Sequence, residues 1–190
     1  MIIGLTGRIA AGKGYVVAYL LEKSFKYTTL SQLIRDELSR RGLEVTRKNL
    51  QDIGNEVREK EGATAWIKRL VQNLKENENY IVDGIRNPGE INELKKHKDF
   101  FLIALDAPQL TRFERVVQRN KASDPKTWEG FLEMDTRDFG EDNPLGQQVG
   151  KCMQVADFHI MNDLSVEELN KKIDDVFGII SEMLKNREAI

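Results

Sequence analysis

The chain has 190 residues, of which 40% are hydrophobic and 32% are charged, enough apolar content for one folded domain with its own core. Its 29 Lys and Arg residues against 31 Asp and Glu residues give a net charge of −2, which excludes a generally basic surface for nucleic acid or membranes. One cysteine and two histidines exclude an intramolecular disulfide and a Cys/His zinc cluster. The longest apolar run, 100–105, falls far short of the roughly 18 residues that span a bilayer. We therefore expect a cytoplasmic protein that binds neither nucleic acid nor membranes.

Short apolar runs alternate with longer segments of helical periodicity, the pattern of a parallel sheet covered by helices. Strands are predicted at Ile2–Thr6, Phe25–Thr29, Tyr80–Asp83, Phe100–Asp106 and Phe158–Met161. Helices are predicted at 13–23, 31–42, 47–61, 63–76, 88–97, 109–119, 128–138 and 166–187. No repeat or linker divides the chain, so the prediction is a single domain.

A phosphate-binding loop directly follows the first predicted strand. The segment from Gly7 to Lys13 matches the first seven places of the pattern G-x-x-x-x-G-K-[ST], between a strand and a helix. Glycines let the backbone N–H groups turn inward, the helix directs its positive end at the anion, and Lys13 adds a point charge. We therefore expect ATP to bind here. The expected ATP-binding residues are Gly7, Arg8, Ile9, Ala10, Ala11, Gly12, Lys13, Gly14 and Tyr15.

The loop departs from the pattern in its last place. Gly14 stands where a Ser or Thr hydroxyl would bind magnesium. Because Mg²⁺ keeps several of its waters in such sites, a nearby carboxylate can hold the ion through water. Asp83, at the end of a predicted strand, is the candidate for that role.

Several further motifs resemble the adenylate-kinase-like nucleoside monophosphate kinases. Lys13-Gly14 at the end of the loop is similar to theirs, and Ser31-Gln-Leu-Ile-Arg35 resembles the segment whose arginine holds the acceptor phosphate. Val82-Asp-Gly-Ile-Arg86 resembles their Asp-Gly-x-(x)-Arg element, although it is one residue shorter and lacks the usual proline.

The resemblance continues toward the C-terminus. Leu105-Asp-Ala-Pro108 followed by Arg115 and Arg119 is similar to the strand end and paired arginines that lead into the lid. Arg137 stands where a returning lid arginine is expected, but the lid motif itself is not matched. Asn162 and Asp163 resemble the turn that contacts the adenine base.

A group of small adenylate-kinase-related, dephospho-CoA-kinase-like proteins shows the most extensive similarity. It has stretches similar to 58–62 (REKEG), 83–86 (DGIR), 124–128 (DPKTW) and 156–163 (ADFHIMND). The resemblance spans nearly the whole chain and implies a P-loop NTPase fold, a three-layer α/β/α arrangement with a five-stranded parallel sheet. It implies a core of residues 1–30, 77–119 and 146–190, a helical acceptor-binding section at 31–76 and a lid at 120–145.

The same resemblance implies a phosphotransferase that moves the γ-phosphate of ATP to a nucleoside monophosphate with Mg²⁺ as cofactor. The implied catalytic residues are Lys13, Asp83, Arg86, Arg115, Arg119 and Arg137. The implied acceptor-binding residues are Ser31, Arg35, Arg58, Gly84 and Arg86, and Asn162 joins the ATP-binding set. The arginines themselves favour phosphoryl transfer, because a planar guanidinium bridges phosphate oxygens and neutralises their charge.

Two other functions remain open at this stage. A kinase of a hydroxyl acceptor, such as dephospho-CoA, would benefit from a carboxylate near the second strand, where Thr28-Thr-Leu-Ser-Gln32 offers none. A phosphate acceptor needs cations instead, which the arginines provide, so it is the favoured reading. The missing loop hydroxyl and the unmatched lid leave room for a nucleotide-binding sensor or assembly ATPase with weak hydrolysis.

Overall fold

The computed structural model describes residues 1–121, 124–140 and 147–188. Five parallel strands form one sheet in the order β2-β3-β1-β4-β5. The strands are β1 (Ile2–Gly7), β2 (Lys26–Thr29), β3 (Tyr80–Asp83), β4 (Phe100–Asp106) and β5 (Phe158–Met161). The predicted α/β fold with a five-stranded parallel sheet is confirmed, with differences of one residue at β1 and β2.

Helices follow or precede each strand. They are α1 (Lys13–Glu22), α2 (Leu30–Arg40), α3 (Arg47–Glu61), α4 (Ala65–Gln72), α5 (Pro88–Leu94), α6 (Gln109–Arg119), α7 (Trp128–Phe139), α8 (Val149–Gln154) and α9 (Val166–Glu188). Helix α8 was not predicted, because a six-residue helix gives little periodicity; Cys152 is fully buried in it. Helix α4 is shorter than predicted, since Asn73 and Leu74 already bond back three residues in a tightened last turn.

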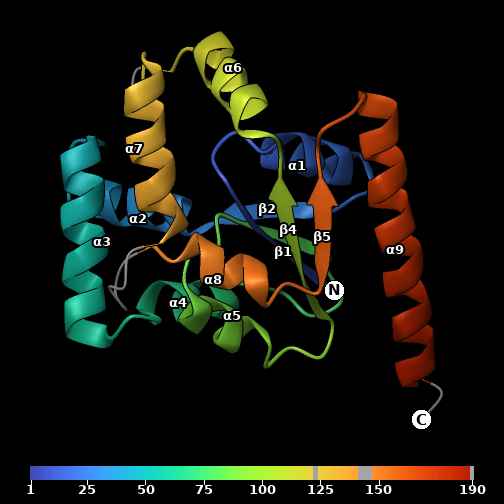
Figure 1. Cartoon of the computed structure of the whole chain (residues 1–190). Helices are drawn as coiled ribbons and strands as arrows, with labels where there is room; N and C mark the ends of the chain where they lie inside the picture. The colour runs from blue at the N-terminus through green and yellow to red at the C-terminus, as the bar shows by residue number, and fades with distance from the viewer. Residues whose placement is uncertain (122–123, 141–146, 189–190) are drawn as a thin grey trace.

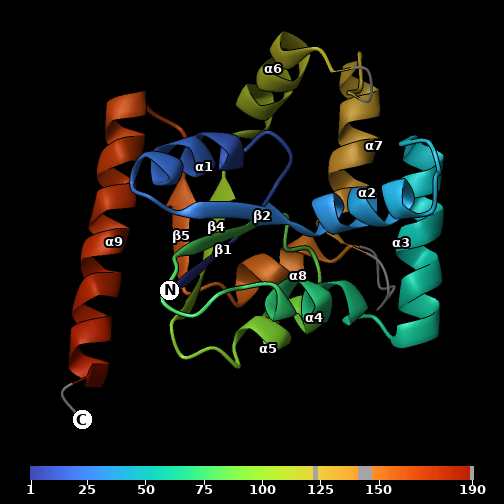
Figure 2. The same cartoon turned by 180° about the vertical axis from the view of Figure 1, so that it is seen from behind.

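Alternate residues of the strands face two separate cores. One core joins Ile3 and Leu5 of β1 to α1 and to Ile173 of α9. The other joins Val82 of β3 and Leu102 of β4 to α2, α3, α4, α5 and α8. In both Figure 1 and Figure 2, α9 and α3 therefore lie at opposite sides of the sheet.

Two groups of helices also pack among themselves. Helices α2, α3 and α4 pack together, and the buried Trp66 indole donates to Gly54 O at 3.1 Å. Helix α7 packs on α6 through Phe113, Trp128 and Phe131, whose ring centroids are 5.2 to 5.6 Å apart. The predicted lid, 120–145, includes α7, but its residues 122–123 and 141–145 lie outside the described ones.

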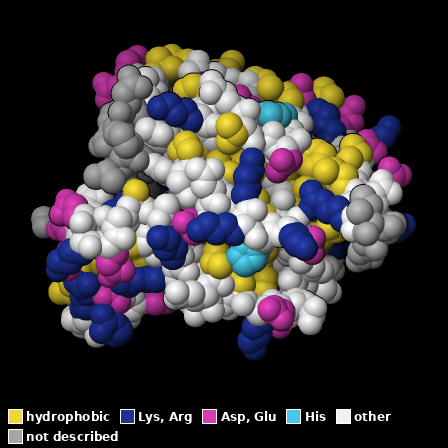
Figure 3. Space-filling model, turned by 90° about the horizontal axis from the view of Figure 1, so that it is seen from below, with side chains coloured by type: hydrophobic (Ala, Val, Ile, Leu, Met, Phe, Trp, Pro, Cys, Tyr) yellow, Lys and Arg dark blue, Asp and Glu magenta, His cyan; other side chains and the backbone are white. Residues whose placement is uncertain are grey.

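The surface matches the balanced charge of the sequence. On the face seen in Figure 3, basic and acidic side chains are interspersed. Within the described ranges, no helix has the length and apolar character to cross a membrane.

Candidate functional site

The loop between β1 and α1 depends on two of its glycines. Gly7 has φ +131°, and a Cβ there would stand 2.0 Å from Leu105 O on the neighbouring strand. Gly12 has φ +107°, and a Cβ there would stand 2.2 Å from the amide nitrogen of Asn162. Only glycine therefore fits either position. At Gly14 a Cβ would meet no atom within 4 Å, so a larger residue would fit there.

Lys13 is folded back over this loop. Its Nζ donates to Gly7 O at 2.7 Å and to Arg8 O at 2.9 Å. Desolvation by burial lowers the pKa of Lys13 to about 8, against the opposing effect of the Asp83 charge. A weakly solvated ammonium held by two carbonyl oxygens is ready to exchange them for anionic oxygens.

A cavity of about 930 Å³ opens in front of the loop, at the carboxyl ends of the strands. Basic side chains from separate segments line it: Lys13, Arg86, Arg119, Lys121 and Arg137, together with Arg8. The carboxylates of Asp83, Asp124, Asp135 and Asp138 line it as well. The fold thus gathers cations from the loop, β3 and the α6–α7 region around one space large enough for sizeable ligands.

Asp83 presents a carboxylate oxygen that the described residues leave unsatisfied. Its Oδ1 is buried without a hydrogen-bond partner in the described part of the chain, while Oδ2 accepts from the Tyr27 hydroxyl at 3.3 Å. A buried unpaired acceptor is costly unless a ligand or water satisfies it. No group of three or more metal-ligating side chains occurs among the described residues. These donors fit a Mg²⁺ ion held through its waters and by phosphate oxygens, and do not fit a protein cage.

Arg86 is fixed at the edge of the cavity by its own backbone. Its N–H donates to the Glu90 carboxylate at 2.9 Å, within the capping box that starts α5. Its carbonyl accepts from Gln148 N at 2.7 Å, and its Nη1 donates to Gln147 Oε1 at 2.9 Å. The turn before it needs Gly84, which has φ +80°. The exposed guanidinium keeps donors free for a ligand.

The α6–α7 region supplies two more of the predicted arginines. Arg119 binds Asp124 through two hydrogen bonds of 2.7 and 2.9 Å, which lower the pKa of that carboxyl. Arg137 lines the cavity from the last turn of α7 and is exposed. Ser31, at the start of α2, also lines the cavity. The structure therefore brings these three predicted residues to the same space as Lys13 and Arg86.

Three predicted arginines lie outside the cavity lining. Arg115 donates instead to Ala10 O at 3.4 Å and Asn162 O at 3.3 Å. Arg58 lies 3.5 Å from Asn55 Oδ1, and its charge opposes the burial that raises the pKa of Glu90. Arg35 is exposed on α2. One helical turn separates Arg115 from Arg119, but the Arg115 guanidinium contacts backbone carbonyl oxygens and the Arg119 guanidinium binds Asp124 at the cavity.

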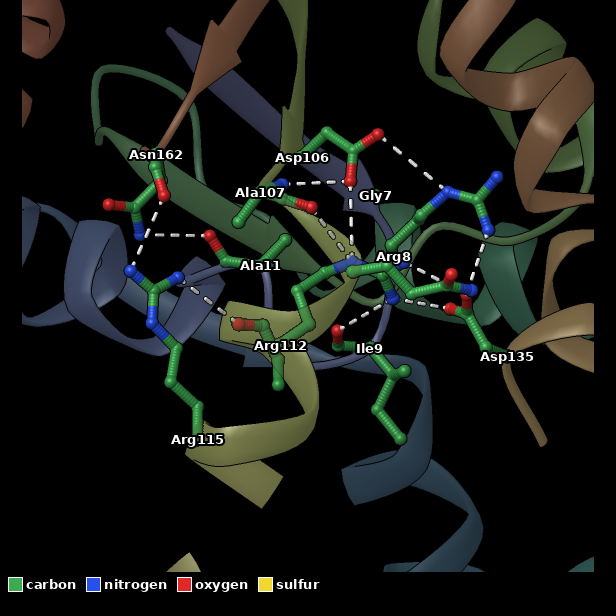
Figure 4. Close-up of polar contacts among 12 residues, drawn as sticks. Gly7, Arg8, Ile9, Ala11, Asp106, Ala107, Arg112, Arg115, Asp135 and Asn162 are labelled. Atoms are coloured by element: carbon green, nitrogen blue, oxygen red, sulfur yellow. Dashed lines mark hydrogen bonds and ion pairs between the residues drawn. The ribbon is translucent and has the colours of Figure 1, made fainter. Parts of the chain in front are cut away.

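Two residues that the sequence predicts to bind ATP have their side chains engaged by other parts of the protein. The Asn162 side chain donates to Ala11 O at 3.0 Å, and its backbone N–H donates to Asp106 O at 2.7 Å (Figure 4). The Tyr15 hydroxyl donates to Asn170 Oδ1 at 2.8 Å, which ties α1 to α9. Ile9 and Ala10 present carbonyl oxygens to arginines of α6.

Sequence reasoning missed several residues of the site. Arg112 is buried and pairs with the buried Asp135 of α7 (Figure 4). Tyr27 and Asp138 line the cavity. The sequence around a charged residue on a helix does not show whether that residue is buried. The one available signal is the i,i+3 spacing of Asp135 and Asp138, which places both on the same face of a helix.

The comparisons with known proteins agree with this fold. Residues 3–137, which include the loop, match a family model described as "AAA domain". The solved structures of a gluconokinase from Sinorhizobium meliloti (TM-score 0.58, 13% identity, 97% of this chain, 95% of that one) and a shikimate kinase from Bacteroides thetaiotaomicron (TM-score 0.58, 12% identity, 95% and 98%) share the fold. They show a P-loop kinase-like fold, and do not single out the nucleoside monophosphate kinases.

A closer relative lies among the archaea. A UPF0200 protein of Methanocaldococcus jannaschii is 35% identical over 192 residues, which cover 99% of this chain and 93% of that protein. The aligned region includes the loop, the cavity and α9. The chain therefore belongs to the UPF0200 family of proteins with a P-loop AAA domain.

Proposed function

We propose that the protein transfers the γ-phosphate of ATP to a nucleoside monophosphate. The observation that carries this proposal is the single cavity in which Lys13 and the phosphate-binding loop face Arg86, Arg119 and Arg137. A donor and an acceptor that both carry phosphate bring much negative charge into one place, and this cavity supplies the matching cations.

Each group has a separate task in this scheme. The loop amides and Lys13 hold the outer phosphates of ATP, and Arg86 holds the acceptor phosphate. Arg119 and Arg137 neutralise the charge that develops on the transferred group. Asp83 holds Mg²⁺ through water, and the ion supplies charge neutralisation and orientation of the phosphates. Arg115 has no task in this scheme, since it lies outside the cavity lining and donates to Ala10 O and Asn162 O.

Two arginines outside the cavity lining contribute to the acceptor side. The charge of Arg58 stabilises the Glu90 carboxylate, which in turn accepts a hydrogen bond from the Arg86 backbone N–H. Arg35 acts electrostatically on Tyr27, a cavity residue, so it remains a candidate at the rim of the acceptor site.

Asp138 favours a second candidate function, a kinase with a hydroxyl acceptor. Its side chain lines the cavity and its charge acts on Lys13. A carboxylate in this position can orient an acceptor hydroxyl or take its proton. The segment 28–32 at the second strand has no carboxylate for this role.

The test is a coupled ADP-release assay with ATP and Mg²⁺. Ribo- and deoxyribonucleoside monophosphates form the panel, and dephospho-CoA is the hydroxyl-acceptor control. Release with one or a few monophosphates, well above the acceptor-free background, supports the proposal. ADP release with dephospho-CoA alone contradicts the proposal and supports the second candidate, a kinase with a hydroxyl acceptor. ATP binding without release on any acceptor favours a sensor or assembly ATPase.

Arg86→Ala is expected to raise the acceptor KM by roughly 10- to 100-fold, the effect of losing one charge-assisted phosphate contact. The KM for ATP should change less than about 3-fold, because the phosphate-binding loop is untouched. Steady-state kinetics with each substrate varied in turn provides the measurement. Arg41→Ala is the control, since Arg41 pairs with Glu37 and Glu56 on the surface. A larger effect on the ATP KM would remove Arg86 from the acceptor site.

ATP binding is expected to take up a proton near pH 8. The free protein has a Lys13 pKa of about 8, and the phosphates of ATP raise it by adding negative charge nearby. Below about pH 7 Lys13 is already charged, so affinity is flat; above pH 8 affinity falls as the ammonium is lost. Calorimetry in two buffers of different ionisation enthalpy measures the uptake. Binding with no proton uptake at pH 8 would show that Lys13 does not meet the phosphates.

A further inference from the structure

Arg8, the second residue of the loop, has its side chain engaged by α7. Its Nη1 donates to Asp135 Oδ2 at 3.0 Å, and its guanidinium carbon lies 3.7 Å from the centroid of the Phe139 ring. Its Nε is also 3.7 Å from Asp106 Oδ2 at the end of β4. Figure 4 shows Arg8 between Asp106 and Asp135. The side chain is 23% exposed, and Arg8 also lines the cavity. A carboxylate and an aromatic face together hold this guanidinium against α7.

Asp135 is a shared anchor for the loop and α6. It is 3% exposed, and it also accepts a hydrogen bond of 2.9 Å from Arg112 Nη2. Arg112 in turn donates to Ala107 O at 3.0 Å and to Ile9 O at 3.4 Å. Both arginines that contact Asp135 are thus connected to the phosphate-binding loop: Arg8 is a residue of the loop, and Arg112 donates to Ile9 O of the loop.

Helix α7 is held differently at its two ends. The Trp128 and Phe131 rings fix the N-terminal half against Phe113 of α6. The C-terminal half, which brings Arg137 and Asp138 to the cavity, meets the loop through Arg8. Asp135 and Asp138 lie one turn apart on the same face of the helix. The contacts of Asp135 therefore also fix the direction in which Asp138 points.

We propose that Arg8 is a positioning residue that ties the phosphate-binding loop to α7 and so fixes the place of Arg137. Its backbone remains part of the loop, but its side chain binds the helix, in contrast to the ATP contact expected from the sequence. For the transfer step the inference rests on the proposed function. A misplacement of about 1 Å at a reacting centre lowers rates by as much as about 100-fold, so a small shift of α7 is sufficient for a large effect.

The experiment compares Arg8→Met with Arg69→Met. Arg69 is a matched control, because it also combines a carboxylate, Glu61, with an aromatic ring, Trp66 at 5.1 Å, on α4 away from the cavity. Three quantities are measured on the full chain: hydrogen exchange of the amides of 135–139, the ATP Kd by calorimetry, and kcat for transfer. In Arg8→Met we expect exchange about 10-fold faster, an ATP Kd within about 3-fold of wild type, and kcat lower by at least about 10-fold. None of these changes is expected in Arg69→Met.

A double-mutant cycle with Arg137→Ala tests the route of the effect. If Arg8 acts through α7, its removal lowers kcat much less once Arg137 is absent. Arg8→Lys, which keeps a charge for Asp135, should restore part of the lost kcat. An ATP Kd raised 10-fold or more with unchanged exchange at 135–139 would overturn the inference and make Arg8 a phosphate ligand. Unchanged values of all three quantities would overturn it as well.

Failure of the proposed function gives a different result. In that case wild-type protein transfers phosphate to no acceptor, whereas the exchange and ATP Kd measurements still report on Arg8.

Discussion

Lys13→Met is expected to lower phosphoryl transfer by about 1,000-fold or more, the scale for losing a preorganised charge at the transferring group. The Lys13 ammonium is the positive charge inside the loop, bonded to the carbonyl oxygens of Gly7 and Arg8. Methionine fills the same space without the charge, so the phosphates lose both attraction and orientation.

The fold should survive this substitution. Burial already lowers the pKa of Lys13 to about 8, which shows that its surroundings disfavour a charge. The melting temperature is therefore expected to stay the same or rise. Lys96→Met is the control, because Lys96 pairs with Glu93 on the surface. Turnover at the wild-type rate in Lys13→Met would contradict the proposed role of the loop.

Asp83→Asn is expected to lower transfer by about 100-fold and to raise the Mg²⁺ concentration needed for half-maximal rate. The carboxylate has one buried oxygen, Oδ1, without a partner among the described residues, and an amide is a weaker acceptor for the waters of a metal ion. Its charge also raises the pKa of Lys13. The proton uptake on ATP binding should therefore shift to lower pH in this variant.

Metal binding can be measured independently of turnover. Paramagnetic resonance of Mn²⁺ in the presence of ATP gives the affinity of the ternary site, which Asp83→Asn should weaken. Asp174→Asn is the control, since Asp174 contacts Tyr19 and Lys23 on the surface. Equal Mn²⁺ affinity in wild type and Asp83→Asn would remove Asp83 from the metal site.

Much of the fold could be read from local sequence patterns. The strands show as short apolar runs, and the spacing of Gly7, Gly12 and Lys13 predicts the loop. The positive φ of Gly7 and Gly12 is a local requirement for glycine, whereas their close approaches to Leu105 and Asn162 come from the tertiary structure. Helix α8 could not be found in this way, because six residues give too short a pattern and its burial comes from packing.

The arginines show where local patterns stop being sufficient. Arg115 and Arg119 have the same residue type and lie one turn apart, yet Arg115 donates to Ala10 O and Asn162 O and Arg119 lines the cavity. Arg58 is predicted to bind the acceptor, but it lies outside the cavity lining and its charge acts on Glu90. Where a long side chain ends depends on partners from other segments, which spacing cannot reveal.

The sequence by itself determined the P-loop, the parallel sheet and the presence of a lysine at an anion site, because these depend on backbone conformation and on residues adjacent in the chain. Only the tertiary structure decided which charges share the cavity and which are already paired. Arg8 and Asp135 are 127 residues apart in sequence and 3.0 Å apart in space. Buried charges must find partners of opposite sign, and folding selects those partners from the whole chain.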